Sequence, residues 1–154
     1  MPRAVPPNMT DYAETRRSFR LEVPEVFNFA RDVVDARARR EPDRLALLAT
    51  GPDGGETARF TFADLARASN RAANALAAHG VGKGDRVFVM LHRVPAWHLA
   101  LLGCIKLGAV PMPGTPLLTP RDIAYRIGEA EAMAVITDAD GPRRSNGSVR
   151  AARR

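Results

Sequence analysis

Histidine and cysteine are the residues of this chain best suited to acid–base, nucleophilic or metal chemistry, and their spacing limits what they can do. The histidines are His79, His92 and His98; no two lie four residues apart, and no carboxylate stands at metal-ligand spacing near His92 or His98. We therefore expect surface or loop roles for them. The single cysteine, Cys104, lies in an apolar run, which is typical of a small buried hydrophobe. The absence of a Gly-x-Ser-x-Gly sequence excludes a nucleophile elbow.

A glycine-rich segment with one lysine, Gly80–Asp85, has the composition of a phosphate-binding loop. However, no Gly-Lys-Ser or Gly-Lys-Thr follows at the spacing that such a loop requires. The segment also precedes an apolar run, whereas phosphate loops follow a strand and open a helix. We therefore interpret it as a tight turn from a helix into a strand.

Two further segments, 91–97 and 108–116, follow or contain short apolar runs that predict strands. Ligands of open α/β sheets bind at the carboxyl ends of the strands, so both segments are candidates for a binding edge. The second holds three prolines, and its Gly114 allows a ligand or a neighbouring backbone to approach closely. The alternative is that the prolines only fix a crossover loop.

Helices and strands must position these two segments, and the hydrophobic periodicity of the sequence predicts an α/β fold. Thr61 and Thr119 stand where helix N-caps are expected, and Gly80 and Gly108 stand where helices should stop. Helix, strand, helix, strand, helix and strand alternate after Phe62, which indicates a small, mostly parallel sheet with helices on both faces. The expected helices are Val23–Glu41, a segment capped by Thr61 and ending before Gly80, Pro95–Leu107 and Pro120–Ala130; the expected strands are Leu45–Ala49, Arg59–Phe62, Arg86–Leu91, Ala109–Met112 and Met133–Thr137.

Charge and composition divide the 154 residues into three parts. Residues 1–22 contain three early prolines and predict an irregular arm, residues 23–138 carry the periodic pattern, and residues 139–154 predict a disordered basic tail. That tail holds five arginines against one aspartate, a net charge of +4, so the other 138 residues carry only +2 of the total +6. The basic balance is therefore mostly a property of the tail, and we do not expect nucleic-acid binding.

Composition also bears on the compartment. Arg, His or Lys interrupts every long apolar run, so no membrane-spanning helix is expected, and the N-terminus has no apolar core of a signal peptide. One cysteine excludes an internal disulfide. These features favour the cytoplasm.

The order of several sequence blocks resembles the N-terminal part of the adenylate-forming (AMP-binding) enzymes, and most closely the medium-chain acyl-CoA synthetases. The resemblance covers residues 10–138, and no single block is diagnostic. The blocks are Phe60–Leu65, Ser69–Leu76, Gly80–Val87 and Gly108–Val110 for the wider family, and Glu25–Asp35, Arg93–His98 and Pro111–Thr115 for the medium-chain type.

The resemblance implies a ligase of fatty acid metabolism that joins a carboxylate to ATP, with Mg²⁺, and then transfers the acyl group to CoA. It also implies that the chain covers only the first subdomain of that fold. The family's Ser/Thr/Gly-rich phosphate loop, its aromatic-Gly-x-Thr-Glu motif and its catalytic lysine have no counterpart in this sequence. We therefore expect a truncated synthetase that does not bind its cofactors productively and has no catalytic residue of its own. The acyl substrate stays open.

Two positions of this chain match residues that contact CoA in related enzymes. In related CoA synthetases the loop that matches 112–115 lies beside the CoA, which implies a cofactor role for Gly114. A basic residue after the last predicted strand meets the CoA 3′-phosphate in such enzymes, which implies the same for Arg143. No metal-binding residue is implied.

Two other functions compete with this interpretation. The chain could be a non-catalytic module that pairs with a full-length synthetase through an unfilled sheet edge, and apolar surface left by a missing neighbour could also cause self-association. A basic nucleic-acid-binding protein is the third possibility, which the nearly neutral body disfavours.

Overall fold

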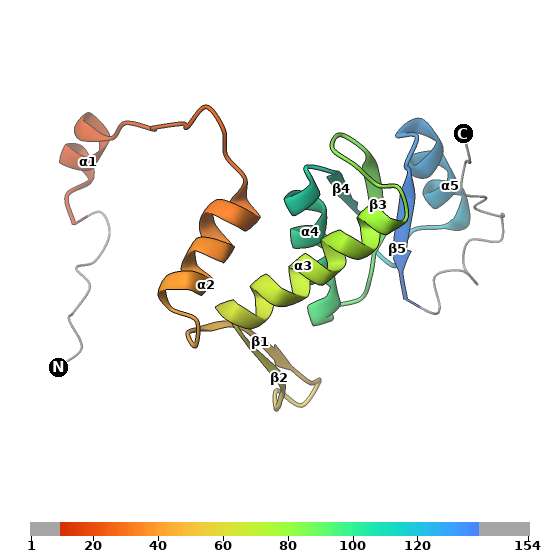
Figure 1. Cartoon of the computed structure of the whole chain (residues 1–154), viewed down its shortest axis with the longest axis horizontal. Helices are drawn as coiled ribbons and strands as arrows, with labels where there is room; N and C mark the ends of the chain where they lie inside the picture. Colours follow the sequence, from red (N-terminus) through yellow and green to blue (C-terminus); the bar gives the residue numbers. More distant parts are fainter. Residues whose placement is uncertain (1–9, 139–154) are drawn as a thin grey trace.

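The larger of the two sheets is three-stranded and parallel. The computed structural model describes residues 10–138 (Figure 1). The strands are β3 (Arg86–Met90), β4 (Val110–Pro113) and β5 (Ala134–Thr137), in the spatial order β4-β3-β5. Val87 pairs with Pro111 on one side and with Ala134 on the other, both in parallel. The predicted α/β class with a small, mostly parallel sheet is confirmed.

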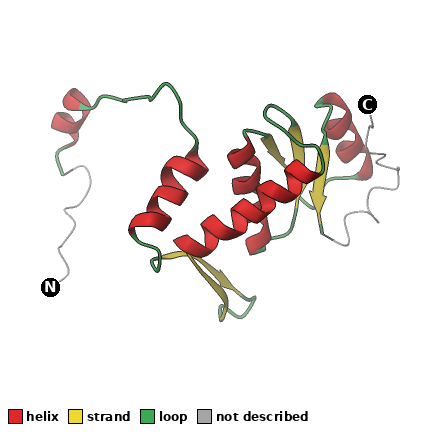
Figure 2. Cartoon of the chain, viewed as in Figure 1, coloured by secondary structure: helices red, strands yellow, loops and turns green. Residues whose placement is uncertain are grey.

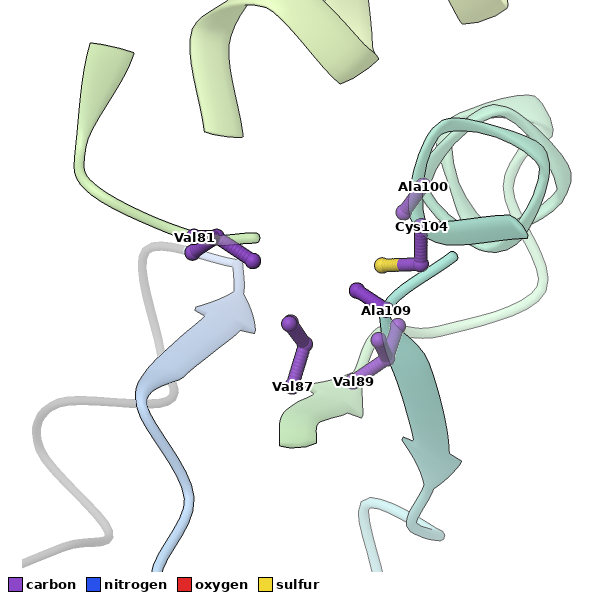
Figure 3. Packing of buried hydrophobic residues seen from close by; sticks show 6 residues of the cluster. All are labelled: Val81, Val87, Val89, Ala100, Cys104 and Ala109. Carbon is purple, nitrogen blue, oxygen red and sulfur yellow. The ribbon is translucent and has the colours of Figure 1, made fainter. Parts of the chain in front are cut away.

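The middle strand, β3, is buried on both faces, as its continuous apolar sequence predicted. Val87 and Val89 pack toward helix α4 (Pro95–Leu107), together with Val81, Ala100, Cys104 and Ala109 (Figure 3). Phe88 and Met90 point to the opposite face and pack against Ile123 of helix α5 (Pro120–Glu129). The strand therefore has a helix on each face, with α4 on one side and α5 on the other (Figure 2).

Local capping signals set the ends of these helices. Helix α3 (Phe62–Ala78) begins with a capping box in which Thr61 and Asp64 bond each other's backbone N–H, and Thr119 and Asp122 do the same for α5. The backbone N–H and hydroxyl of Thr61 hold the pKa of Asp64 below its ordinary value. Helix α4 ends at Gly108, whose φ of 73° is the left-handed conformation that favours glycine.

Helix α4 is packed on two sides. Gly103 meets α3, where an added Cβ would lie 2.8 Å from the Cβ of Ala72. A second cluster joins Leu102 to Ala30, Val34 and Leu65. Leu99 and Ile105 pack against this second cluster, and Leu101 packs against the sheet-side cluster. Each of these apolar side chains therefore packs against a cluster of this chain.

The N-terminal elements differ from the prediction. The helix expected from Val23 begins only at the π-helical turn η1 (Ala30–Asp35) and continues as α2 (Ala36–Arg40). Asn28 and Asp32 explain the later start, because the Asn28 side chain accepts from the Arg31 N–H at 3.1 Å and the Asp32 carboxylate accepts from the Asn28 N–H at 2.7 Å. These bonds satisfy backbone donors of the first turn.

The arm before this helix contains one regular element. Residues 1–22 were expected to be irregular, yet Tyr12–Ser18 form helix α1, which Asp11 caps by accepting from the Glu14 N–H at 2.9 Å. None of its residues is buried. The arm extends away from the sheet (Figure 1).

An antiparallel hairpin of β1 (Leu45–Thr50) and β2 (Glu56–Thr61) lies between η1/α2 and α3 in sequence. It forms a separate two-stranded sheet, and strands were expected in both places. Gly54 adopts a φ of 80° in its turn. The predicted tail, 139–154, lies outside the described residues.

Candidate functional site

The carboxyl ends of β3 and β5 bring a histidine and a carboxylate together. His92, which follows β3, contacts the carboxylate of Asp138, which follows β5, through its Nδ1 atom. An ionised carboxylate only accepts, so the ring donates through Nδ1 and the neutral imidazole presents Nε2 as an acceptor. The side chains are 53% and 32% exposed, so the pair lies at the surface where it can meet a solute.

Sequence reasoning missed this pair because the two residues are far apart in the chain. The search for a carboxylate near His92 used local spacing, whereas Asp138 lies 46 residues away. The available signal was the parallel sheet itself, since both residues directly follow predicted strands whose carboxyl ends share one edge. What the sequence did not reveal is that β3 and β5 are direct neighbours.

A surface hollow of about 760 Å³ adjoins this edge. One wall is formed by β1 and the turn after it, and the other by residues 91–95, 97 and 98. Leu47, Val94 and Trp97 make the hollow partly apolar, while His92 and Arg93 add polar groups. Such a lining suits a small molecule with an apolar part and an anionic group. The contribution of the hairpin was not predicted.

Gly114 lies at the same edge, directly after β4. Its N–H donates to the carbonyl of Val89 at 2.9 Å. A Cβ at this position would lie 2.5 Å from Cζ and 2.9 Å from Cε2 of Phe88, a ring that is only 1% exposed. The core side chain of Phe88 therefore makes the close approach that Gly114 permits. A contact with a cofactor stays a prediction.

The other candidate residues fall in different places. Arg143 lies outside the described residues, so the structure does not relate it to Gly114. The segment after Gly80 is a tight turn, as predicted: the Gly82 N–H donates to the Asp85 carboxylate at 2.8 Å, and the Gly84 N–H donates to the Gly108 carbonyl at 2.9 Å.

Of the remaining candidates, His98 lines the hollow, whereas Cys104 and His79 do not. Burial raises the pKa of the Cys104 thiol, which fits the predicted role as a small core residue. His79 contacts the Ala75 carbonyl through Nδ1 at 2.8 Å, and His98 stacks edge-on against Trp97 with ring centres 5.0 Å apart.

Within residues 10–138 no group of three or more His, Cys, Asp or Glu is arranged to hold a metal ion. Nor does that part of the chain contain a helix with the length and apolarity to cross a membrane.

The open sheet, with helices on both faces, defines an α/β class of protein, and ligands of this class bind at the carboxyl ends of the strands. Comparison with known proteins narrows this class. The family model described as "AMP-binding enzyme" matches residues 34–153, so the chain belongs to the AMP-binding enzyme family.

Similar proteins of known sequence include the mammalian acyl-CoA synthetases. The chain is 39% identical over 142 residues to the mitochondrial acyl-coenzyme A synthetase ACSM3 of Mus musculus, covering 88% of this chain and 24% of that protein. Human ACSM2B, also mitochondrial, is 42% identical over 122 residues, covering 75% of this chain and 21% of the relative. The chain therefore spans about a quarter of the length of these relatives, and it resembles the medium-chain synthetases as the sequence blocks indicated.

Solved structures agree with the sequence relatives. An acyl-CoA synthetase of Brucella canis superposes with a TM-score of 0.72 at 28% identity, covering 87% of this chain and 24% of that one. The N-terminal domain of FACL13 from Mycobacterium tuberculosis gives a TM-score of 0.68 at 26% identity, covering 76% of this chain and 28% of that domain. The fold is therefore that of the N-terminal part of adenylate-forming enzymes.

Proposed function

We propose that residues 23–138 are the N-terminal scaffold of an AMP-forming medium-chain acyl-CoA synthetase, a ligase that makes acyl-CoA, AMP and pyrophosphate from a carboxylic acid, ATP and CoA. The observation that carries this proposal is the relationship to ACSM3, which extends over 88% of this chain. In such an enzyme, ATP with Mg²⁺ would supply the adenylyl group that activates the carboxylate, and pyrophosphate would leave. The scaffold residues would position the carboxyl edge of the sheet against the rest of the fold.

By itself, this chain is proposed to be inactive. Adenylation requires groups that stabilise the charge developing on the phosphates and the carboxyl oxygen. The sequence lacks the family's phosphate loop, its aromatic-Gly-x-Thr-Glu motif and its catalytic lysine. ATP, Mg²⁺ or CoA bound to the chain would then not react, because the chain has no group that stabilises the transition state of adenylation.

Gly114 and Arg143 are the residues proposed to approach CoA. Gly114 follows a strand at the carboxyl edge of the sheet, and its lack of a side chain leaves backbone groups close to the surface. Arg143 would contribute a guanidinium to the 3′-phosphate. Their joint action requires that Gly114 and Arg143 contact the same CoA molecule.

A chimeric enzyme tests the scaffold. Residues 23–138 would replace the matching stretch of mouse ACSM3, and acyl-CoA formation from medium-chain acids would be measured with KM values for ATP and CoA. We expect the chimera to make acyl-CoA. The Gly114→Ala chimera should raise the KM for CoA more than that for ATP, and a Gly128→Ala chimera is the matched control with unchanged kinetics. A chimera that melts cooperatively yet makes no acyl-CoA would contradict the proposal.

A second function, as a non-catalytic partner of a full-length synthetase, is favoured by one observation. Apolar side chains at the end of the arm and the start of the scaffold are strongly exposed: Phe19, Leu21, Val23, Val26 and Phe27 are each 57% exposed or more. An apolar segment of this size commonly marks a contact surface. Co-purification with a full-length synthetase, lost when these side chains are replaced by serine, would support this function; the same exposed segment could also mediate self-association.

The compartment and the division of the chain also stay proposals. The arm 1–22, the scaffold 23–138 and the tail 139–154 are proposed as separate units. A cytoplasmic location was expected from the sequence, whereas the names of the mammalian relatives place those proteins in mitochondria. Fractionation of cells that express the chain at its natural level distinguishes the two locations.

A further inference from the structure

The segment that follows helix α1 has the residue pattern of a strand with one buried face, although no strand of the described chain pairs with it. Phe19, Leu21 and Val23 alternate with Arg20 and Glu22, so an extended backbone places three apolar side chains on one face and two charges on the other. The backbone is extended at Phe19, with φ −58° and ψ 127°, and Val23 precedes a proline, which favours the same conformation. The three apolar side chains are each at least 63% exposed, and the segment runs away from the sheet (Figure 1).

The backbone groups of this segment show which residues can pair with another strand. Phe19 donates its N–H to the Thr15 carbonyl at 2.8 Å, and its own carbonyl accepts from the Arg20 guanidinium at 2.9 Å. Within residues 10–138 the N–H and carbonyl groups of Arg20 and Glu22 make no such bond. In an antiparallel pair, residues that exchange two hydrogen bonds alternate with residues that exchange none. A second strand would therefore bond to the backbone of Arg20 and Glu22.

The charges of the segment are complementary to those of a second copy. When two copies pair antiparallel with a two-fold axis at Leu21, Arg20 of each copy lies opposite Glu22 of the other. Phe19 then lies opposite Val23, and the two Leu21 side chains meet on the axis. Both charges are available within residues 10–138, because Arg20 donates only to nearby backbone carbonyls and Glu22 has no polar partner.

We propose that residues 19–23 are an interaction surface for the same segment of a second copy, paired antiparallel about Leu21. This is a specific form of the self-association considered above, and it does not rest on synthetase activity. The charges select the register: a shift of two residues in either direction brings two copies of Arg20 or two copies of Glu22 together, and a parallel pairing in register does both. Pro24 ends the pairing because it has no N–H to donate.

The apolar face supplies the main driving force, since pairing removes part of six exposed apolar side chains from water. A ribbon of two short strands is only marginally stable. The dimer should therefore be weak and should depend on concentration. Each copy presents the same surface to the other, so the interface is isologous.

Other strands compete for the same segment. The outer edges of the β1–β2 hairpin are unpaired within the described residues, and a full-length synthetase could offer an edge of its own. Neither of these partners brings residue 20 of one copy opposite residue 22 of another. Reversal of the two charges therefore distinguishes the self-pairing from its competitors.

Sedimentation velocity of the full chain over roughly 5 to 500 μM tests the proposal, and we expect a reversible monomer–dimer equilibrium. Arg20→Glu sets glutamates against glutamates, and Glu22→Arg sets arginines against arginines, so each variant alone should raise the dimer dissociation constant at least roughly tenfold. An equimolar mixture of these two variants restores opposite charges at both pairs and should form a heterodimer. Glu25→Arg is the matched control, because it makes the same charge reversal at an exposed position outside the segment and should dimerise like the unmodified chain.

The variants change only exposed side chains, so the far-ultraviolet circular dichroism of each monomer should match that of the unmodified chain. A monomer at every concentration would overturn the proposal. So would single variants that dimerise like the unmodified chain, a mixture that stays monomeric, or species larger than a dimer, which would mean that another edge takes the segment. The ACSM3 chimera contains only residues 23–138, so its kinetics and this equilibrium can fail independently of each other.

Discussion

Gly114 offers the sharpest test of how the carboxyl edge of the sheet is built. In Gly114→Ala, the new Cβ would lie 2.5 Å from Cζ of Phe88, whereas carbon atoms in contact normally lie about 3.5–4.0 Å apart. The ring belongs to the most buried side chain of its cluster and has little room to move. Overpacking of this kind costs about 1–3 kcal/mol.

One effect opposes this cost. Replacing glycine by alanine restricts the unfolded chain, which stabilises a protein by about 0.4–1 kcal/mol where the native backbone tolerates it. The balance predicts that Gly114→Ala lowers the free energy of unfolding by about 1–2 kcal/mol. At roughly 4 °C per kcal/mol for a domain of this size, the melting temperature should fall by roughly 4–8 °C.

Urea unfolding followed by Trp97 fluorescence and circular dichroism measures this change. Gly128→Ala is the control, because no atom lies within 4 Å of its added Cβ and the position is in helix α5, where alanine should stabilise by up to about 1 kcal/mol. A Phe88→Leu background removes the clashing ring atoms and should reduce the cost of Gly114→Ala by about 1 kcal/mol. An equal cost in both backgrounds would refute the steric explanation.

Three further outcomes follow from other contacts. Lys106 Nζ lies 2.7 Å from the Asp35 carboxylate in a pair that is only 9% and 20% exposed, so Asp35→Ala should lower the unfolding free energy by about 1–3 kcal/mol, measured by urea titration. Hydrogen bonds from the cap threonines hold the pKa values of Asp64 and Asp122 below the ordinary 3.8; these bonds therefore stabilise the fold above that pH, and the contribution should be lost as pH falls below it. Acid titration of Asp64→Asn should show a shallower loss than the unmodified chain. The buried thiol of Cys104 should react with a thiol reagent at least tenfold faster in urea than in buffer, and equal rates would contradict its burial.

Elements with strong local signals were predictable from the sequence. Helix α4 begins at Pro95 and ends at Leu107 as expected, because proline at the first position and Gly108 after the last leave little freedom. The apolar run of β3 likewise predicted a strand buried on both faces. By contrast, the start of η1 depends on side-chain bonds of Asn28 and Asp32, so the helix begins later than the expected Val23.

The candidate site was only partly predictable, and the reason is topological. The carboxyl edge of the sheet and the place of Gly114 on it follow from the alternation of helices and strands. The contact of His92 with Asp138 depends on strand order, which hydrophobic periodicity does not encode. The same holds for Phe88 against Gly114, since a glycine signals close approach without naming the neighbour.

The central claim is that this chain has the scaffold of an AMP-forming synthetase and lacks the groups that carry out adenylation. Carboxylate-dependent exchange of labelled pyrophosphate into ATP measures that step directly, with octanoate and benzoate as acids and a no-enzyme reaction as the baseline. A preparation of Gly114→Ala purified in parallel controls for synthetases of the expression host. The account predicts exchange at the baseline for both preparations. Exchange clearly above the baseline, which copurifies with the chain and is altered in the Gly114→Ala preparation, would contradict it.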